Sequence, residues 1–113
     1  MHEFSIAESI ISIALDTMKK NNGKVLKEIE LEIGTASGIE VGSLEFALSS
    51  LLEKSFKNHV SVHVTKIKAI AFCTICNNEF ETEGPFPFCP DCNTFSGSLK
   101  QGKELKIKSI QID

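Results

Sequence analysis

The chain has 113 residues, of which 42% are hydrophobic and 24% charged, with a formal net charge of −3 and a pI of about 5.6. That length suits one small domain, or one domain with a subdomain, and the acidic balance argues against a surface built for nucleic acid or anionic lipid. Apolar runs are shorter than the ~20 residues of a membrane span, and acidic residues from Glu3 onward are not typical of a secretory signal. We therefore expect a cytoplasmic protein, in which thiols stay reduced.

The first part of the chain predicts a helix followed by a strand. Residues 5–8 match a capping box with Ser5 as the N-cap. The apolar residues that follow recur at spacings of three and four as far as Met18, which is typical of an amphipathic helix ending near Lys20. Residues 26–33 alternate between aliphatic and glutamate side chains, so they predict a strand with one buried face.

The rest of the chain predicts one more helix and two strands, with a cysteine-rich module between the strands. Ser43 is expected to cap the helix, whose apolar stripe over 44–52 fits helical periodicity. Alternating valines over 60–64 predict a strand, the cysteine module occupies 70–98, and residues 105–112 predict the last strand. Because a helix joins the first two strands, we expect them to be parallel with a right-handed crossover. Both helices can then cover one face of a three-stranded sheet.

Polar side chains outside the cysteine module are interpreted as surface. His59 and His63 lie four positions apart on a predicted strand, which puts them on one face but about 13 Å apart, too far for one ion. The pair Gly34 and Gly38 lacks the Gly-Lys-Ser/Thr ending of a phosphate loop, and no nucleophile–base arrangement is visible, so we expect no enzyme activity. The open face of the sheet is expected to carry solvated charges at Glu28, Glu30, Glu32, Lys106 and Lys108.

The four cysteines stand in two C-x-x-C pairs, Cys73 with Cys76 and Cys89 with Cys92. This spacing can place four thiolates at the corners of a tetrahedron, which favours a closed, structural zinc site. Asn77 and Asn93 follow the second cysteine of each pair, where a zinc knuckle often needs a positive φ that asparagine tolerates. One alternative is a disulfide framework, which a reducing compartment disfavours. The other is a rubredoxin-like iron site, whose usual second C-P-x-C-G knuckle would place glycine at position 93.

The amino terminus is the second candidate metal site. Histidine after Met1 normally prevents removal of the initiator, so the α-amine, the backbone nitrogen of His2 and its imidazole could form two adjacent chelate rings around Ni²⁺ or Cu²⁺. Glu3 would add an oxygen or hold the geometry. The alternative is a frayed terminus, which the predicted cap at Ser5 disfavours, because a helix starting there ties the terminus down.

Together these features resemble the HypA/HybF family of hydrogenase-maturation nickel metallochaperones over essentially the whole chain. Four stretches carry the resemblance: residues 1–9 (MHEFSIAES), residues 32–34 (EIG) followed by residues 37–38 (SG), the two C-x-x-C pairs, and residues 102–110 (GKELKIKSI). It implies an α+β fold with two helices on a mixed three-stranded sheet and an inserted zinc-ribbon-like subdomain. It divides the chain into a nickel-binding domain, residues 1–68 plus 102–113, and a zinc-binding subdomain, residues 69–101.

The resemblance also implies function and partners. The protein would bind Ni²⁺ as cargo through Met1 and His2, with Glu3 important for the site and Glu40 joining as in some members. The four cysteines would hold a structural zinc ion. Delivery would involve a HypB-type GTPase and the large subunit of [NiFe]-hydrogenase, and urease maturation proteins could be further partners. We expect a monomer or weak homodimer.

Two departures from the family and two rival functions accompany this interpretation. Asn77 and Asn93 stand where some relatives have histidine, and Lys68 stands where proline is frequent. A nucleic-acid-binding zinc ribbon is one rival, but residues 70–95 contain no lysine or arginine. The other rival is a protein-interaction adaptor without a nickel role, which would use the Phe-rich cysteine module as its contact surface.

Overall fold

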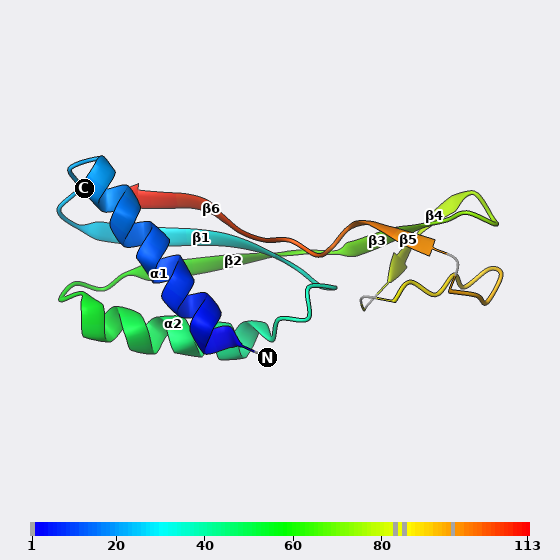
Figure 1. Cartoon of the computed structure of the whole chain (residues 1–113), viewed down its shortest axis with the longest axis horizontal. Coiled ribbons are helices and arrows are strands. Elements are labelled where there is room, and N and C mark those ends of the chain that lie inside the picture. Colours follow the sequence, from blue (N-terminus) through cyan, green and yellow to red (C-terminus); the bar gives the residue numbers. More distant parts are fainter. Residues whose placement is uncertain (1, 83, 85, 96) are drawn as a thin grey trace. The chain divides into compact units, whose positions relative to one another are not determined.

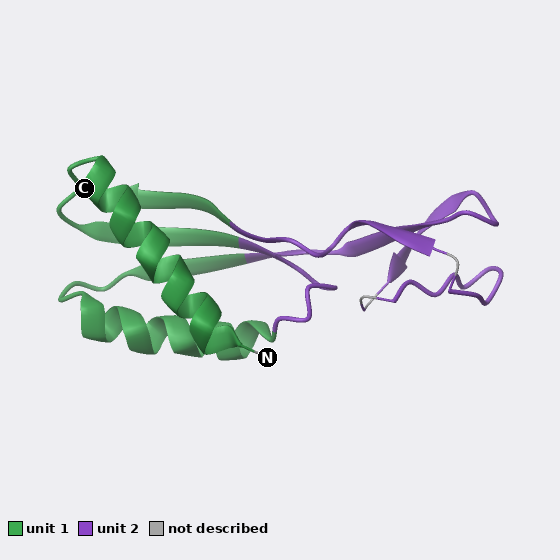
Figure 2. Cartoon of the chain, viewed as in Figure 1, with its two compact units in different colours: residues 1–31, 40–64, 107–113 green, residues 32–39, 65–106 purple. Residues whose placement is uncertain are grey.

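The computed structural model describes residues 2–82, 84, 86–95 and 97–113. Within these residues the chain forms two helices and six strands (Figure 1). The chain divides into two compact units (Figure 2). Residues 1–31, 40–64 and 107–113 form the first unit, and residues 32–39 and 65–106 form the second. The elements in chain order are α1 (Glu3–Lys20), β1 (Leu26–Gly34), α2 (Val41–Ser55), β2 (Ser61–Ile67), β3 (Ala69–Cys73), β4 (Asn78–Thr82), β5 (Gly97–Gln101) and β6 (Leu105–Ile112).

This order confirms the predicted succession of helix, strand, helix, strand, cysteine module and strand. One sheet has the strand order β2-β1-β6. The chain runs in the same direction through β1 and β2 and in the opposite direction through β6 (Figure 1), so the sheet is mixed. None of the described helices is long and apolar enough to cross a membrane.

The core of the first unit lies between the two helices and β1. α1 and α2 pack against each other, and Leu26, Ile29, Leu31, Leu44 and Leu48 are fully buried. Burying a side chain of this size stabilises the fold by roughly 1.5–3 kcal/mol. The remaining buried apolar residues of this unit are Ala7, Ile10, Ile11, Ala14, Met18, Ala47, Leu52 and Val60.

The glutamate row of β1 faces away from this core, as predicted. In the first unit, Glu28 Oε1 lies 2.6 Å from His63 Nε2 on the neighbouring strand β2. In the second unit, Glu32 Oε1 lies 3.0 Å from Lys106 Nζ on β6. In each pair the glutamate is partly buried and its partner is exposed, and surface pairs contribute at most about 1 kcal/mol each.

Both predicted helix caps are wrong. α1 begins at Glu3 with His2 as the N-cap, so Ser5 lies inside the helix. α2 begins at Val41, and its N-cap is Glu40, whose carboxylate accepts the backbone N–H groups of the first turn. At α2 the Glu40 side chain caps the start of the helix, whereas at α1 the N-cap His2 makes no side-chain capping hydrogen bond. Neither serine is the N-cap of its helix.

The second unit contains an antiparallel sheet with the order β4-β3-β5. β3 is central: Cys73 pairs with Asn78 on β4 and with Gly97 on β5. Ala69, Ala71 and Cys73 are buried on one face of β3. This sheet carries the cysteine module and was not predicted as separate strands from the sequence.

The chain segments that lead into this sheet approach one another closely within the second unit. Gly34 donates its N–H to the Glu104 carbonyl at 2.8 Å, and Ala36 donates to the Gly102 carbonyl at 2.7 Å. A Cβ atom at Gly34 would lie 1.9 Å from the Gly102 oxygen. Ala69 donates its N–H to Thr35 Oγ1 at 2.9 Å. The turn after β1 is therefore bonded to two other segments, and only glycine fits at position 34.

Candidate metal centres

The four cysteine sulfurs form one tight cluster. The Sγ atoms all lie within 4.8 Å of one another, with Cys73 and Cys92 separated by 3.7 Å and Cys76 and Cys89 by 3.9 Å. No disulfide joins these four cysteines. Four sulfurs bound tetrahedrally to zinc at about 2.3 Å would be about 3.8 Å apart. The donor set therefore fits a closed four-thiolate zinc site.

Two turns of the same kind present these sulfurs. Asn77 and Asn93 both have φ of 56°. Their N–H groups donate to the Cys73 and Cys89 carbonyls, each at 2.8 Å. The Cys76 N–H also points at the Cys73 sulfur at 3.4 Å. These features confirm the two predicted knuckles, because asparagine supplies the left-handed conformation that each turn needs.

The cluster disfavours charge on its own thiols. Burial raises the pKa of Cys76 to about 12, and hydrogen bonds with Cys92, Cys89 and Cys73 add to the effect. The Cys92 N–H lowers the pKa of Cys89, but burial and the neighbouring thiols raise it above the ordinary value overall. Residues 70–95 provide no lysine or arginine as a counter-charge. A divalent cation would supply the charge that four thiolates need.

The amino terminus is tied into α1 from residue 2 onward. His2 is exposed, and its carbonyl accepts the Ile6 N–H at 3.0 Å, so its backbone belongs to the helix start and is not frayed. Glu3 is buried, with 9% relative exposure, and its Oε2 accepts the Glu40 N–H at 3.1 Å. Met1, the other predicted nickel ligand, lies outside the described residues.

Glu40 stands at the start of α2, and its carboxylate caps that helix. Oε1 accepts the Gly42 N–H at 3.2 Å, and Oε2 accepts the N–H and the hydroxyl of Ser43, each at 2.6 Å. No local pattern indicates the contact between Glu3 and Glu40, because the two residues are 37 positions apart. The structure thus brings Glu3 to the backbone of Glu40.

Across residues 2–82, 84, 86–95 and 97–113, the cysteines are the one group of three or more His, Cys, Asp or Glu side chains close enough to share an ion. The side chains of His2, Glu3 and Glu40 do not form such a group. His63 is paired with Glu28, and His59 is exposed just before β2. Both histidines are therefore placed as surface residues, as predicted.

The fold and the cysteine cluster define a small α+β metal-binding protein with a zinc-ribbon-like unit. The sequence profile of the HypA family, described as hydrogenase/urease nickel incorporation, metallochaperone, matches residues 1–112. The chain belongs to this HypA family of metallochaperones.

Curated relatives and solved structures agree with that assignment. A protein named hydrogenase maturation factor HypA from Parabacteroides distasonis is 37% identical over 99% of this chain and 97% of its own length. One of the same name from Francisella philomiragia is 34% identical over 97% of both chains. The solution structure of the nickel metallochaperone HypA from Helicobacter pylori matches 99% of this chain and 97% of its own with a TM-score of 0.66. Because its sequence identity is 22%, that match supports the fold alone.

Proposed function

We propose that this chain carries Ni²⁺ for the maturation of [NiFe]-hydrogenase and binds it at the amino terminus. Membership of a family described by nickel incorporation supports the cargo. The observation that supports this site most is the position of His2. It is exposed at the start of α1, and its carbonyl accepts a hydrogen bond from the Ile6 N–H. The α-amine, the His2 amide nitrogen and the imidazole then act as a compact nitrogen donor set for a square-planar ion.

Glu3 holds this site in place more than it binds the metal. One oxygen of its buried carboxylate already accepts the Glu40 N–H. That bond ties the residue after His2 to the start of α2, so the donors of His2 are attached to an ordered backbone. Glu40 is the further candidate ligand, and its carboxylate is also needed as the cap of α2. A ligand set exposed to solvent suits a carrier, which must release its ion.

The zinc site has a structural role in this proposal. Cys73, Cys76, Cys89 and Cys92 would hold the ion, which would stabilise the knuckles and the short sheet beside them. A four-thiolate site leaves no position for substrate water. This arrangement supports a non-enzymatic protein.

The partners follow from the family resemblance. We infer that nickel passes to the hydrogenase large subunit with the help of a HypB-type GTPase in the cytoplasm. Urease maturation proteins are a second acceptor class, since the family description includes urease. A monomer or weak homodimer would suit transient contacts of this kind.

The decisive experiment is a Ni²⁺ titration of zinc-loaded protein with its native terminus, beside protein with one additional N-terminal residue. The added residue moves the α-amine while it keeps the His2 imidazole. The native protein should bind one Ni²⁺ per chain, and both the extended protein and His2→Ala should bind much more weakly. His59→Ala, at an exposed histidine elsewhere, is the matched control and should bind like the native protein. Equal binding by native and extended protein would overturn the terminal site.

The pH dependence gives a second test of the same ligands. Nickel competes with protons for the amine, the amide nitrogen and the imidazole, so acid conditions should weaken binding. The affinity should therefore fall between about pH 7.5 and pH 5.5. A constant affinity over this range would contradict the proposed ligand set.

One observation favours the adaptor as a second candidate function. Three apolar side chains of the cysteine module in the second unit are largely exposed, with relative exposures of 76% for Phe86, 71% for Phe95 and 64% for Ile75. Exposed aromatic side chains of this kind are frequent in protein interfaces. An adaptor without a nickel role would bind its partner normally after His2→Ala and would take up no nickel in the titration.

A further inference from the structure

The first unit contains a groove whose lining includes none of the candidate metal ligands. It has a volume of about 390 Å³ and runs between α2 and the beginning of β2. Glu45, Ser49 and Glu53 line it from the helix, and His59, Ser61 and His63 line it from the other side. In Figure 1, α2 runs alongside β2 on the side away from β1.

The strand that forms one wall of this groove is an edge strand. The order β2-β1-β6 leaves the outer edge of β2 without a neighbouring strand in the described part of the chain. Such an edge offers a row of N–H and C=O groups to any extended segment that lies beside it. A groove between an edge strand and a helix has the geometry for adding one strand from a partner.

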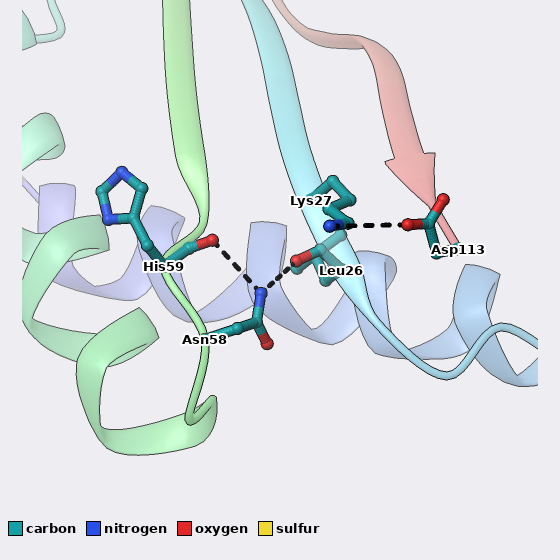
Figure 3. Close-up of polar contacts among 5 residues, drawn as sticks. All are labelled: Leu26, Lys27, Asn58, His59 and Asp113. Atoms are coloured by element: carbon teal, nitrogen blue, oxygen red, sulfur yellow. Dashed lines mark hydrogen bonds and ion pairs between the residues drawn. The ribbon is translucent and has the colours of Figure 1, made fainter.

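The loop that enters β2 is held in place, so this wall is ordered. Figure 3 shows the Asn58 amide pointing to two carbonyl groups. Asn58 Nδ2 donates to the Leu26 carbonyl at 2.7 Å and to the His59 carbonyl at 3.2 Å. Because Leu26 is fully buried in β1, the bond anchors the start of β2 to the core.

The other wall is acidic. Glu45 and Glu53 are exposed, and neither carboxylate has an ion-pair partner among the described residues. They are two turns apart on α2, which corresponds to about 12 Å along the helix axis. An extended chain covers that distance in about four residues. Two basic side chains at positions i and i+4 of a strand point to the same side, so both could face these carboxylates.

We propose that this groove binds an extended segment of a partner protein, by strand addition to β2. The segment carries lysine or arginine at positions i and i+4, facing Glu45 and Glu53, with a small apolar residue between them. Backbone hydrogen bonds to β2 supply the affinity, and the two carboxylates select the charge and its spacing. The surface is independent of the nickel ligands, so it extends the proposed function without resting on it.

The test uses the full-length, zinc-loaded, ¹⁵N-labelled protein and a blocked peptide, acetyl-Lys-Thr-Val-Thr-Lys-amide. Amide shifts should appear at α2 and at residues 58–63, and alternate amides of β2 should exchange more slowly with solvent. Acetyl-Thr-Lys-Val-Lys-Thr-amide has the same composition with its lysines two positions apart, and it should bind more weakly. No shift in the groove at millimolar peptide, or equal binding of both peptides, would overturn the proposal.

Charge-reversal variants provide a second test of the groove. Glu45→Lys with Glu53→Lys should weaken binding of the lysine peptide about tenfold, because two attractions become repulsions, and should favour acetyl-Glu-Thr-Val-Thr-Glu-amide instead. Glu8→Lys with Asp16→Lys makes the same charge change at the same spacing on α1, where both side chains are exposed, and should leave binding unchanged. Equal losses in both double variants would show a general charge effect and overturn the site. Shifts in the groove that depend on protein concentration without peptide would identify a second copy as the occupant and overturn the proposed partner.

Discussion

The Glu3 carboxylate accepts the backbone N–H of Glu40 at 3.1 Å, across 37 positions of the sequence. This bond links the first residue of α1 to the N-cap of α2. Glu3 is buried, and the acceptor is a charged group, so the hydrogen bond is of the stronger, charge-assisted kind. The start of the candidate nickel site is thereby attached to the second helix.

The first prediction concerns this bond. Glu3→Ala should lower the free energy of unfolding by about 1–3 kcal/mol, because the Glu40 N–H loses its buried acceptor. Glu3→Gln should retain most of the stability, since its amide oxygen can accept the same bond. Chemical denaturation of zinc-loaded protein followed by circular dichroism measures both.

The same two variants separate positioning from ligation. If Glu3 positions the nickel donors, Glu3→Gln should bind Ni²⁺ nearly as the native protein does, and Glu3→Ala should bind it more weakly. A large loss of affinity in Glu3→Gln with unchanged stability would instead make the carboxylate a ligand.

The second prediction concerns the cap of α2. Glu40→Ala removes the acceptor for the Gly42 and Ser43 N–H groups and should lower the free energy of unfolding by about 1 kcal/mol, the usual loss for an N-cap. Glu40→Asp should restore much of it. Glu45→Ala is the control on the same helix, and a surface change of this kind should stay within about 0.5 kcal/mol. Equal stability of Glu40→Ala and the native protein would show that the cap contributes nothing.

The helices and the first sheet could be predicted because their patterns are long and regular. The stripe of α1 up to Met18 and the alternation over β1 each bury one face, so periodicity alone locates them. The helix starts could not be predicted in the same way. A capping box at Ser5 is a local signal, but α1 begins earlier, at Glu3, with His2 as an N-cap that makes no side-chain capping hydrogen bond. At α2 the N-cap is Glu40, three positions before Ser43, and its carboxylate accepts hydrogen bonds from the backbone N–H groups of the first turn.

The sheet around the cysteines illustrates a second limit. β4 contains Asn78, Glu79 and Thr82, whose polarity does not indicate a strand, and β3 buries two small alanines on its inner face. The C-x-x-C spacing predicts the sulfur cluster well, because two knuckles bring four thiols together by local geometry. The strand pairing that surrounds them depends on long-range register, which spacing does not encode. The nickel ligand set stays a prediction.

The third prediction concerns the close approach of Gly34 to Gly102. Gly34→Ala places a Cβ atom 1.9 Å from the Gly102 carbonyl oxygen, so the backbone of one segment must move. Overpacking of this kind typically costs about 1–3 kcal/mol, and the hydrogen bonds from Gly34 and Ala36 would be strained at the same time. Thermal unfolding measures the loss. Gly84→Ala is the matched control, since a Cβ there meets no atom within 4 Å; an equal effect at both positions would contradict the clash.

The last prediction concerns zinc and pH. Only thiolates bind zinc strongly, and burial holds the pKa of Cys76 near 12, with that of Cys89 also raised. Protons therefore compete with the ion more strongly than they would at ordinary thiols, and lowering the pH should steadily lower the zinc affinity. As zinc leaves, the amide signals of residues 70–95 should lose their dispersion, because a unit with so small a core depends on its ion, while those of α1 and α2 should change little. Zinc release to a coloured chelator, followed with amide spectra at each pH, measures both effects. If residues 70–95 stay folded after all zinc has been removed by the chelator, zinc is not the structural support of this segment.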